Sequence, residues 1–290
     1  AGLLMEAELT HLGELLTAPQ KPFVAILGGS KVSDKIEVLE SLVTKADVIL
    51  IGGGMAFTFI KSHGGEIGKS LCEANMDLPR RIEEKARAAG VKLLLPVDVQ
   101  VSTAIKGGSP AETVPADQVP ADKMGLDIGP KTSHLYSAEI AKAKTIFWNG
   151  PMGVFEMDAF CKGTEAVAKA VAKSRATSIV GGGDSVAAIE KLGLAKRITH
   201  ISTGGGASLE YLEGKVLPGV AALDDLRRKM IAGNWKMHKT VSEAVELAED
   251  IVMETNGTLN EVVIFPPFTA LETVADAIDG KHVGYGAQDL

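Results

Sequence analysis

Residues 23–35 read FVAILGGSKVSDK, and this stretch sets the pattern that most of the 290-residue chain repeats. The run Phe23–Leu27 is apolar throughout, which predicts a strand buried on both faces. Two glycines and two lysines, Lys31 and Lys35, follow directly, and an amphipathic pattern over Asp34–Thr44 predicts a helix. A buried strand that leads through glycine into a helix is typical of a parallel α/β sheet.

The same unit recurs along the chain. Further apolar strands are predicted at Val48–Ile51, Val91–Pro96, Thr145–Trp148, Thr177–Val180 and Ile198–Ser202. Further helices are predicted at Leu78–Ala89, Ser133–Ala143, Thr164–Ser174 and Ser185–Leu192. This alternation predicts an α/β fold with a doubly wound, six-stranded parallel sheet of the Rossmann-like kind. Only the proline-rich segment Gly107–Gly129 breaks the rhythm, and we expect a long surface excursion there.

A second α/β rhythm begins after a short charged junction at residues 224–229. Strands are predicted at Met230–Trp235, Glu261–Phe265 and His282–Gly286, with helices at Ser242–Met253 and Thr269–Ile278. We therefore expect one domain over residues 1–226 and a smaller segment over residues 230–290. The chain opens within a helical pattern without an initiator methionine and stops after a strand, so we expect a piece of a longer protein.

Composition narrows the class of protein. Apolar residues make up 46% of the chain and charged residues 23%, which is ordinary for a globular protein. No apolar run approaches the ~20 residues that span a bilayer, and no basic-then-apolar leader is present, so we expect no membrane partner. The net charge of −7 and the lack of a basic stripe argue against nucleic acid. Two cysteines cannot form a disulfide framework, which favours a cytoplasmic location.

Glycine clusters follow five of the six strands predicted in the first domain. They lie at residues 28–29, 52–54, 149–153, 181–183 and 204–206. The carboxyl ends of parallel strands meet at one edge of the sheet, where glycine lets backbone N–H groups approach a phosphate closely. The alternative is that each cluster only permits a tight turn, because neither a complete Walker A nor a complete GxGxxG motif is present. Five clusters on one edge favour the phosphate site.

Four charged side chains stand out within this array. Lys31 and Lys35 are four residues apart, so at a helix start they would project from one face toward the same phosphates; the alternative is a solvated surface pair. Asp184, at a predicted helix start, either caps that helix or holds a magnesium ion. Glu156 either accepts hydrogen bonds from a ribose or is a surface carboxylate. The remaining candidates for chemistry show no metal-ligand spacing or neighbouring base. We expect the histidines to be structural or solvent-exposed and the cysteines to be inert; these residues are His11, His63, His134, His200, Cys72 and Cys161.

Six motifs in this order resemble phosphoglycerate kinase. They are LGGSKVSDKI (27–36), GGGMAF (52–57), GLDIGP (125–130), WNGPMGVFE (148–156), GGDS (182–185) and STGGGA (202–207). The resemblance implies the carboxyl-terminal, nucleotide-binding domain of that family, with residues 1–18 as the end of its interdomain helix. It also implies reversible phosphoryl transfer between 1,3-bisphosphoglycerate and ADP, with Mg2+ and ATP or ADP bound.

The resemblance assigns roles to individual residues. It implies catalytic roles for Lys31, Lys35, Gly183, Gly205 and Gly206, with Lys35 the more direct of the two lysines. It implies nucleotide binding by Gly28, Gly29, Lys31, Lys35, Gly52, Gly53, Gly125, Leu126, Asn149, Glu156, Gly182, Gly183, Asp184 and Ser185. Asp184 would hold Mg2+ through the nucleotide, and Ser185 stands where the family often has threonine. The family's amino-terminal domain, which holds 3-phosphoglycerate or 1,3-bisphosphoglycerate, has no counterpart here, so we expect nucleotide binding with little or no turnover.

The tail resembles the opening of triosephosphate isomerase, through AGNWKM (232–237), FPPF (265–268) and GAQD (286–289). The resemblance implies three strands and two helices of a β/α barrel, with Asn234 as a substrate-binding residue and Lys236 as an electrophile. The isomerase would be incomplete and poorly ordered on its own, and only a complete one would bring oligomerisation. The two parts would form a fused glycolytic polypeptide or a read-through product.

Two other functions stay open at this stage. One is a nucleotide-binding module without catalytic activity. The other is a dinucleotide-dependent oxidoreductase, which the missing GxGxxG motif and the paired lysines disfavour.

Overall fold

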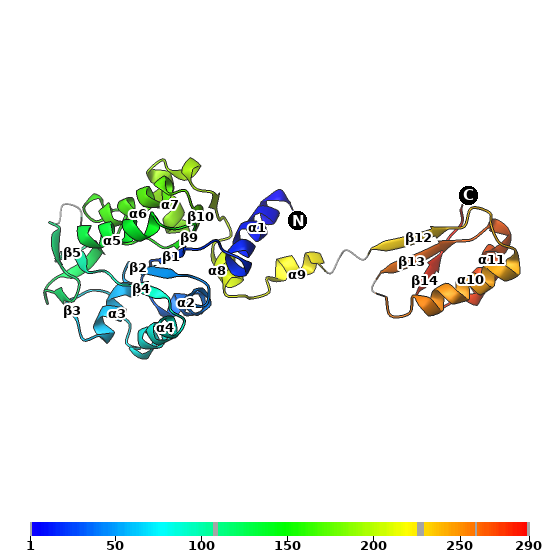
Figure 1. Cartoon of the computed structure of the whole chain (residues 1–290), viewed down its shortest axis with the longest axis horizontal. Helices are drawn as coiled ribbons and strands as arrows, with labels where there is room; N and C mark the ends of the chain where they lie inside the picture. The colour runs from blue at the N-terminus through cyan, green and yellow to red at the C-terminus, as the bar shows by residue number, and fades with distance from the viewer. Residues whose placement is uncertain (1, 107–109, 225–228, 259, 289–290) are drawn as a thin grey trace. The chain divides into compact units, whose positions relative to one another are not determined.

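The computed structural model describes residues 2–106, 110–224, 229–258 and 260–288. By its internal contacts the chain divides into two compact units, Ala1–Leu217 and Pro218–Leu290 (Figure 1). Among the described helices, none has both the length and the hydropathy that a bilayer-spanning segment requires.

The first unit is built on a six-stranded, all-parallel sheet with the strand order β11-β10-β9-β1-β2-β4. Its strands are β1 (Phe23–Leu27), β2 (Val48–Ile51), β4 (Lys92–Leu94), β9 (Thr145–Asn149), β10 (Thr177–Gly181) and β11 (His200–Ile201). The central strand β1 pairs in register with both neighbours, so that Ala25 lies opposite Ile49 on one side and Phe147 on the other. The predicted six-stranded sheet is therefore confirmed.

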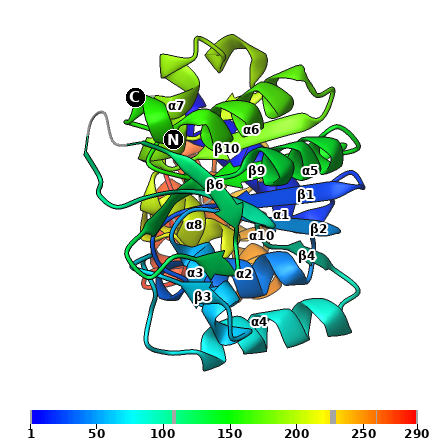
Figure 2. The same ribbon diagram turned by 90° about the vertical axis from the view of Figure 1, so that its left-hand side faces the viewer.

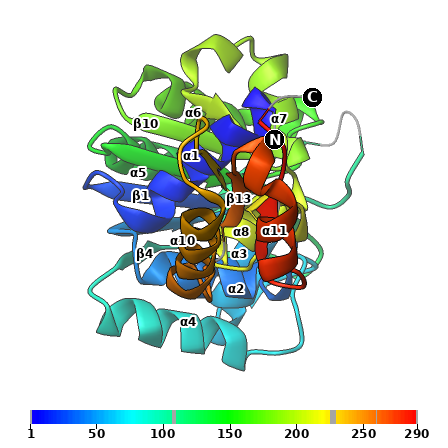
Figure 3. The same cartoon turned by 90° about the vertical axis from the view of Figure 1, so that its right-hand side faces the viewer.

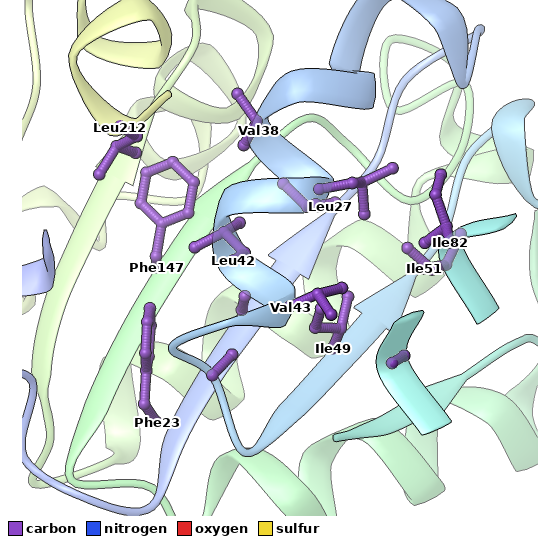
Figure 4. Close-up of a cluster of buried hydrophobic side chains, with 14 of the residues drawn as sticks. Phe23, Leu27, Val38, Leu42, Val43, Ile49, Ile51, Ile82, Phe147 and Leu212 are labelled. Atoms are coloured by element: carbon purple, nitrogen blue, oxygen red, sulfur yellow. The ribbon is translucent and has the colours of Figure 1, made fainter. Parts of the chain in front are cut away.

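Helices cover both faces of this sheet, which explains why its strands are apolar throughout. They are α1 (Leu3–Thr17), α2 (Ile36–Val43), α3 (Met55–Ser62), α4 (Asp77–Ala88), α5 (Pro130–Ile140), α6 (Lys162–Lys173), α7 (Gly183–Lys191) and α8 (Gly206–Leu212). Phe23 and Leu27 pack among residues of α1, α2, α4 and α8, as Figure 4 shows around α2. Val24 and Ile26 point the other way, toward α5, α6 and α7; Figure 2 shows these two helix layers.

The surface excursion predicted for Gly107–Gly129 is wrong; residues 107–109 of that segment lie outside the described residues. Strands β6 (Glu112–Pro115) and β8 (Met124–Ile128) flank β5 (Asp98–Ser102) in a small antiparallel sheet, while β7 (Gln118–Val119) pairs with β3 (Glu66–Ile67). Their apolar side chains form a separate core with residues of α3. The prolines end these strands without preventing them, because strands this short are compatible with proline at an edge or an end.

The second unit contains a parallel sheet of β12 (Met230–Asn234), β13 (Glu261–Phe265) and β14 (Val283–Tyr285), in that order. Helices α10 (Val241–Glu254) and α11 (Leu271–Ala277) lie side by side (Figure 3), and they pack on the sheet through buried residues that include Val262 and Ile264. A short helix, α9 (Pro218–Asp224), precedes them. The predicted three strands and two helices are present, and the described strands form an open sheet and no closed barrel.

Close approach of two strand-end loops in the first unit gives a direct test of the fold. A Cβ atom at Gly28 would lie 2.0 Å from the carbonyl oxygen of Pro151, so Gly28→Ala forces two backbones apart. We expect the free energy of unfolding to fall by about 1–3 kcal/mol in urea denaturation. Gly13→Ala, in helix α1, is the matched control, since its new Cβ makes only ordinary contact at 3.5 Å with Tyr211. Equal stability of the two variants would contradict this account of the packing.

Candidate functional site

A cavity of about 360 Å³ opens at the carboxyl edge of the main sheet. Its lining comes from the loops after β1, β2 and β9, from strand β8, and from the start of α7. The lining residues that the sequence analysis singled out are Gly29, Gly53, Gly125, Leu126, Gly153, Glu156 and Asp184. Glycine loops that are far apart in sequence thus meet at one edge.

Backbone hydrogen bonds join these loops. The N–H of Gly28 donates to the carbonyl of Asn149 at 2.9 Å, and the N–H of Gly53 donates to the carbonyl of Met152 at 3.0 Å. Gly53 also has a left-handed backbone, with φ of +66°, which favours glycine. Gly28 and Gly53 are therefore required by backbone packing and turn geometry, as the alternative explanation for the glycine clusters holds. The same packing also brings the loops together.

Lys35 lies beside this array: its Cε would be 3.2 Å from a Cβ on the lining residue Gly29, while Lys69 is the lysine that lines the cavity itself. Lys35 ends a short 3₁₀ turn, Ser33–Lys35, and its ammonium donates a hydrogen bond to Oδ1 of the buried Asn149. Burial lowers the pKa of Lys35 to about 8, although the carboxylates of Asp184 and Asp34 favour its charged form. A half-buried ammonium with so few partners is suited to an added anion.

Lys31 is placed differently. It is exposed in the loop before the 3₁₀ turn, while helix α2 begins at Ile36. The shared helix face predicted for Lys31 and Lys35 is therefore not formed. The backbone N–H groups of Val32 and Ser33, in the same loop, are not free to bind an anion, because both donate to the carboxylate of Glu73.

The start of helix α7 offers a second set of donors. Its N-cap is Gly182, with φ of +87° and no side-chain cap, so Asp184 does not cap this helix. Within the described part of the chain, no acceptor meets the N–H groups of Gly183 or Asp184. Ser185 is fully buried and its hydroxyl accepts the N–H of Gly150 at 2.6 Å, so this side chain supports the neighbouring loop.

The opposite end of the cavity is apolar. Gly125 lies against the ring of Phe57, so closely that a Cβ there would come within 1.9 Å of the ring. Leu126 and Val154 line the same wall, where the N–H of Val154 donates to the carbonyl of Leu126 at 2.8 Å. Glu156 is exposed and also lines the cavity. The cavity thus combines an apolar part with a polar part lined by Asp184 and Glu156, and the Lys35 side chain lies beside the lining residue Gly29.

Asp127 is a residue of this site that the sequence analysis missed. It is 3% exposed, and its two carboxylate oxygens accept the N–H groups of Gly163 at 2.7 Å and Ile128 at 2.9 Å. Burial raises its pKa to about 7, although both hydrogen bonds oppose that shift. The sequence signal that could have identified Asp127 is its position as the only carboxyl side chain in β8, whose other residues are apolar or glycine.

Several predicted residues lie elsewhere. Gly205 and Gly206 begin α8 after the edge strand β11 and do not line the cavity. Asn234 and Lys236 belong to the second unit, where Oδ1 of Asn234 accepts the N–H of Lys236 at 2.9 Å. Lys236 has a left-handed φ of +46°, an uncommon conformation for a residue with a side chain. Cys72 and Cys161 are free thiols.

The chain matches two families. The family model for phosphoglycerate kinase covers residues 1–215, and the model for triosephosphate isomerase covers residues 229–290. A phosphoglycerate kinase from Koribacter versatilis is 62% identical over 226 residues, which are 77% of this chain and 56% of that protein. A second one, from Pelotomaculum thermopropionicum, is 57% identical over 78% of this chain and 58% of its own length.

Solved structures give the same result. The structure of phosphoglycerate kinase from Coxiella burnetii superposes with a TM-score of 0.75 at 49% identity, over 77% of this chain and 58% of that one. The enzyme from Pyrococcus horikoshii superposes with a TM-score of 0.63 at 34% identity, over 77% of this chain and 56% of that one. The chain therefore spans a little more than half of the length of these relatives.

The raised pKa of Asp127 predicts how the stability of the first unit changes with pH. A carboxyl whose pKa is higher in the folded state stabilises most at low pH, and this contribution is lost as the pH rises through about 7. From pH 8 to pH 5 we expect the wild-type chain to gain about 1–3 kcal/mol relative to Asp127→Asn, measured by urea denaturation. A difference that does not change with pH would show that this carboxyl is ionised throughout.

Proposed function

The chain belongs to the phosphoglycerate kinase family, and we propose that its first unit is the nucleotide-binding half of such an enzyme. The reaction is reversible phosphoryl transfer from 1,3-bisphosphoglycerate to ADP, which gives 3-phosphoglycerate and ATP. The observation that carries this proposal is one cavity that is lined by Gly125 and Leu126 and by Asp184, with the Lys35 side chain next to its lining residue Gly29.

A nucleotide fits the two ends of the cavity. The base lies against the apolar wall of Gly125, Leu126 and Phe57, where the lack of a Cβ on Gly125 lets the Phe57 ring pack directly on its backbone. The carboxylate of Glu156 accepts hydrogen bonds from the ribose hydroxyls. The phosphates then extend toward Lys35 and the first amides of α7, which are donors without a partner in the described part of the chain.

The donor set also fits a nucleotide-borne magnesium ion. The described residues contain no group of three side chains able to hold a metal by themselves. Asp184 supplies one exposed carboxylate at the polar end of the cavity, and Mg2+ is commonly held by one or two carboxylates together with substrate phosphates. When bound, the ion would neutralise phosphate charge.

The residues of this chain contribute charge stabilisation and positioning to the transfer. The ammonium of Lys35 is fixed by Asn149, and the amides of Gly183 and Asp184 point from the start of α7 toward developing negative charge. Phosphoryl transfer needs little covalent participation from a protein, so no nucleophilic side chain is required. The chain spans a little more than half of the length of its relatives, and we expect the remaining part of such an enzyme to hold the acceptor, so this chain alone should bind nucleotide with little or no turnover.

The second unit we assign to a partial triosephosphate isomerase-like segment. Asn234 and the strained Lys236 stand at the end of β12, which is where substrate-binding residues of β/α barrels lie. Only three strands are described, and Met230 and Ile231 on β12 remain more than half exposed. We expect no isomerisation by this chain, and proton exchange at a triose phosphate would contradict that.

The proposed function is tested by calorimetry on the whole chain. We expect ADP with Mg2+ to bind and NAD not to bind, because the phosphate loop lacks the dinucleotide motif. Adding the amino-terminal domain of a relative in trans should then produce phosphoglycerate kinase activity, measured in a coupled assay. Binding of NAD in place of ADP, or full kinase turnover by the chain alone, would refute the corresponding part of the proposal.

The low pKa of Lys35 predicts the pH dependence of nucleotide binding. Because this ammonium loses its proton near pH 8 in the ligand-free chain, ADP affinity should fall as the pH rises from 7.5 to 9.5, with proton uptake on binding. Titrations in buffers of different ionisation enthalpy measure that uptake. Lys35→Met should bind ADP roughly tenfold more weakly at pH 7.5 and show no such pH dependence. An unchanged pH profile in Lys35→Met would assign the effect to another group.

A further inference from the structure

The segment Lys69–Glu73 connects the two ends of the cavity. Lys69 and Leu71 line the cavity, and the hydroxyl of Ser70 accepts the N–H of Gly125 at 2.9 Å. Leu71 also lies against Gly54, since a Cβ at Gly54 would be 3.1 Å from its side chain. This one segment therefore contacts the apolar end at Gly125 and continues toward the loop that carries the lysines.

Glu73 completes that connection. One oxygen of its carboxylate accepts the N–H of Val32 at 2.6 Å and the N–H of Ser33 at 3.1 Å. These two residues lie between Lys31 and Lys35, forty residues away along the chain from Glu73. Partial burial opposes ionisation of Glu73, but Ser33, Val32 and the charge of Lys31 together hold its pKa below the ordinary value. The carboxylate is thus ionised at neutral pH and accepts charge-assisted hydrogen bonds.

The backbone of Glu73 is also anchored. Its N–H donates to the hydroxyl of Thr58 at 3.2 Å, and Thr58 is fully buried in helix α3. The loop between β1 and α2 is otherwise largely exposed at Ser30, Lys31, Ser33 and Asp34. An anchored carboxylate on an exposed loop restricts where that loop can place its two lysines.

We propose that Glu73 is a positioning residue for phosphate binding, which fixes the Lys31–Lys35 loop and links it to the base end of the cavity. This inference rests on the proposed function, because the ligand is the nucleotide of the same cavity. Glu73 acts through the backbone of Val32 and Ser33 and does not touch the phosphates. Its loss should therefore weaken binding of the phosphates and leave binding of the base unchanged.

The test compares two ligands and three variants. The ligands are ADP with Mg2+ and adenosine, which lacks phosphates. The variants are Glu73→Ala, the conservative Glu73→Gln, which keeps an acceptor oxygen, and Glu84→Ala, which removes an exposed carboxylate of helix α4 that makes no ion pair within the described residues. Affinities come from calorimetry, and amide hydrogen exchange reports on Val32 and Ser33 directly.

For Glu73→Ala we expect exchange at Val32 and Ser33 to be at least tenfold faster, ADP affinity to fall about tenfold, and adenosine affinity to stay within about twofold. Glu73→Gln should recover part of both losses, and Glu84→Ala should match the wild type. Equal weakening of ADP and adenosine, unchanged ADP binding, or unchanged exchange would each overturn the proposal. Failure of the wild-type chain to bind ADP would refute the proposed function and this inference with it. If the wild-type chain binds ADP, any of the three contrary results would refute only the inference about Glu73.

Discussion

The close packing of the β1 and β9 loops is the constraint on which the site depends. Parallel pairing of β1 with β9 ends with the Gly28 N–H bonded to the Asn149 carbonyl, and the two backbones are then too close for any side chain at Gly28. The same approach sets Asn149 where it can accept the Lys35 ammonium. The position of the cation thus follows from the strand register of the sheet.

The negative net charge of the chain is compatible with the proposed anion site, because positive groups lie close to the cavity. The chain carries a formal charge of −7, but the half-buried ammonium of Lys35 lies next to the lining residue Gly29, and the amino end of α7 reaches the cavity at Asp184. Desolvation makes the ammonium of Lys35 costly in the ligand-free state, as its lowered pKa shows. A phosphate bound as proposed would remove that cost by supplying a counter-charge, so the electrostatic penalty of the free site would favour binding.

The sequence predicted the central strands because burial on both faces leaves a continuous apolar run, as in Phe23–Leu27. It did not predict β5 to β8, where strands as short as Gln118–Val119 carry too few residues to show a period. The meeting of the glycine loops was predictable from parallel topology alone. The contacts of Asp127 with Gly163 and of Glu73 with Val32 were not, because these partners are 36 and 41 residues away in the sequence and no local pattern encodes them.

On the proposed function, nucleotide binding and phosphoryl transfer place different requirements on the protein. The groups that would hold the nucleotide come from strand-end loops of the main sheet and from β8 of the small antiparallel sheet, all within the first unit, so nucleotide binding would require only this unit. Phosphoryl transfer additionally requires an acceptor oxygen held in line with the phosphate that moves. On the proposed function, such a half would retain its affinity for nucleotide, whereas its catalytic rate would depend on a second part that supplies the acceptor.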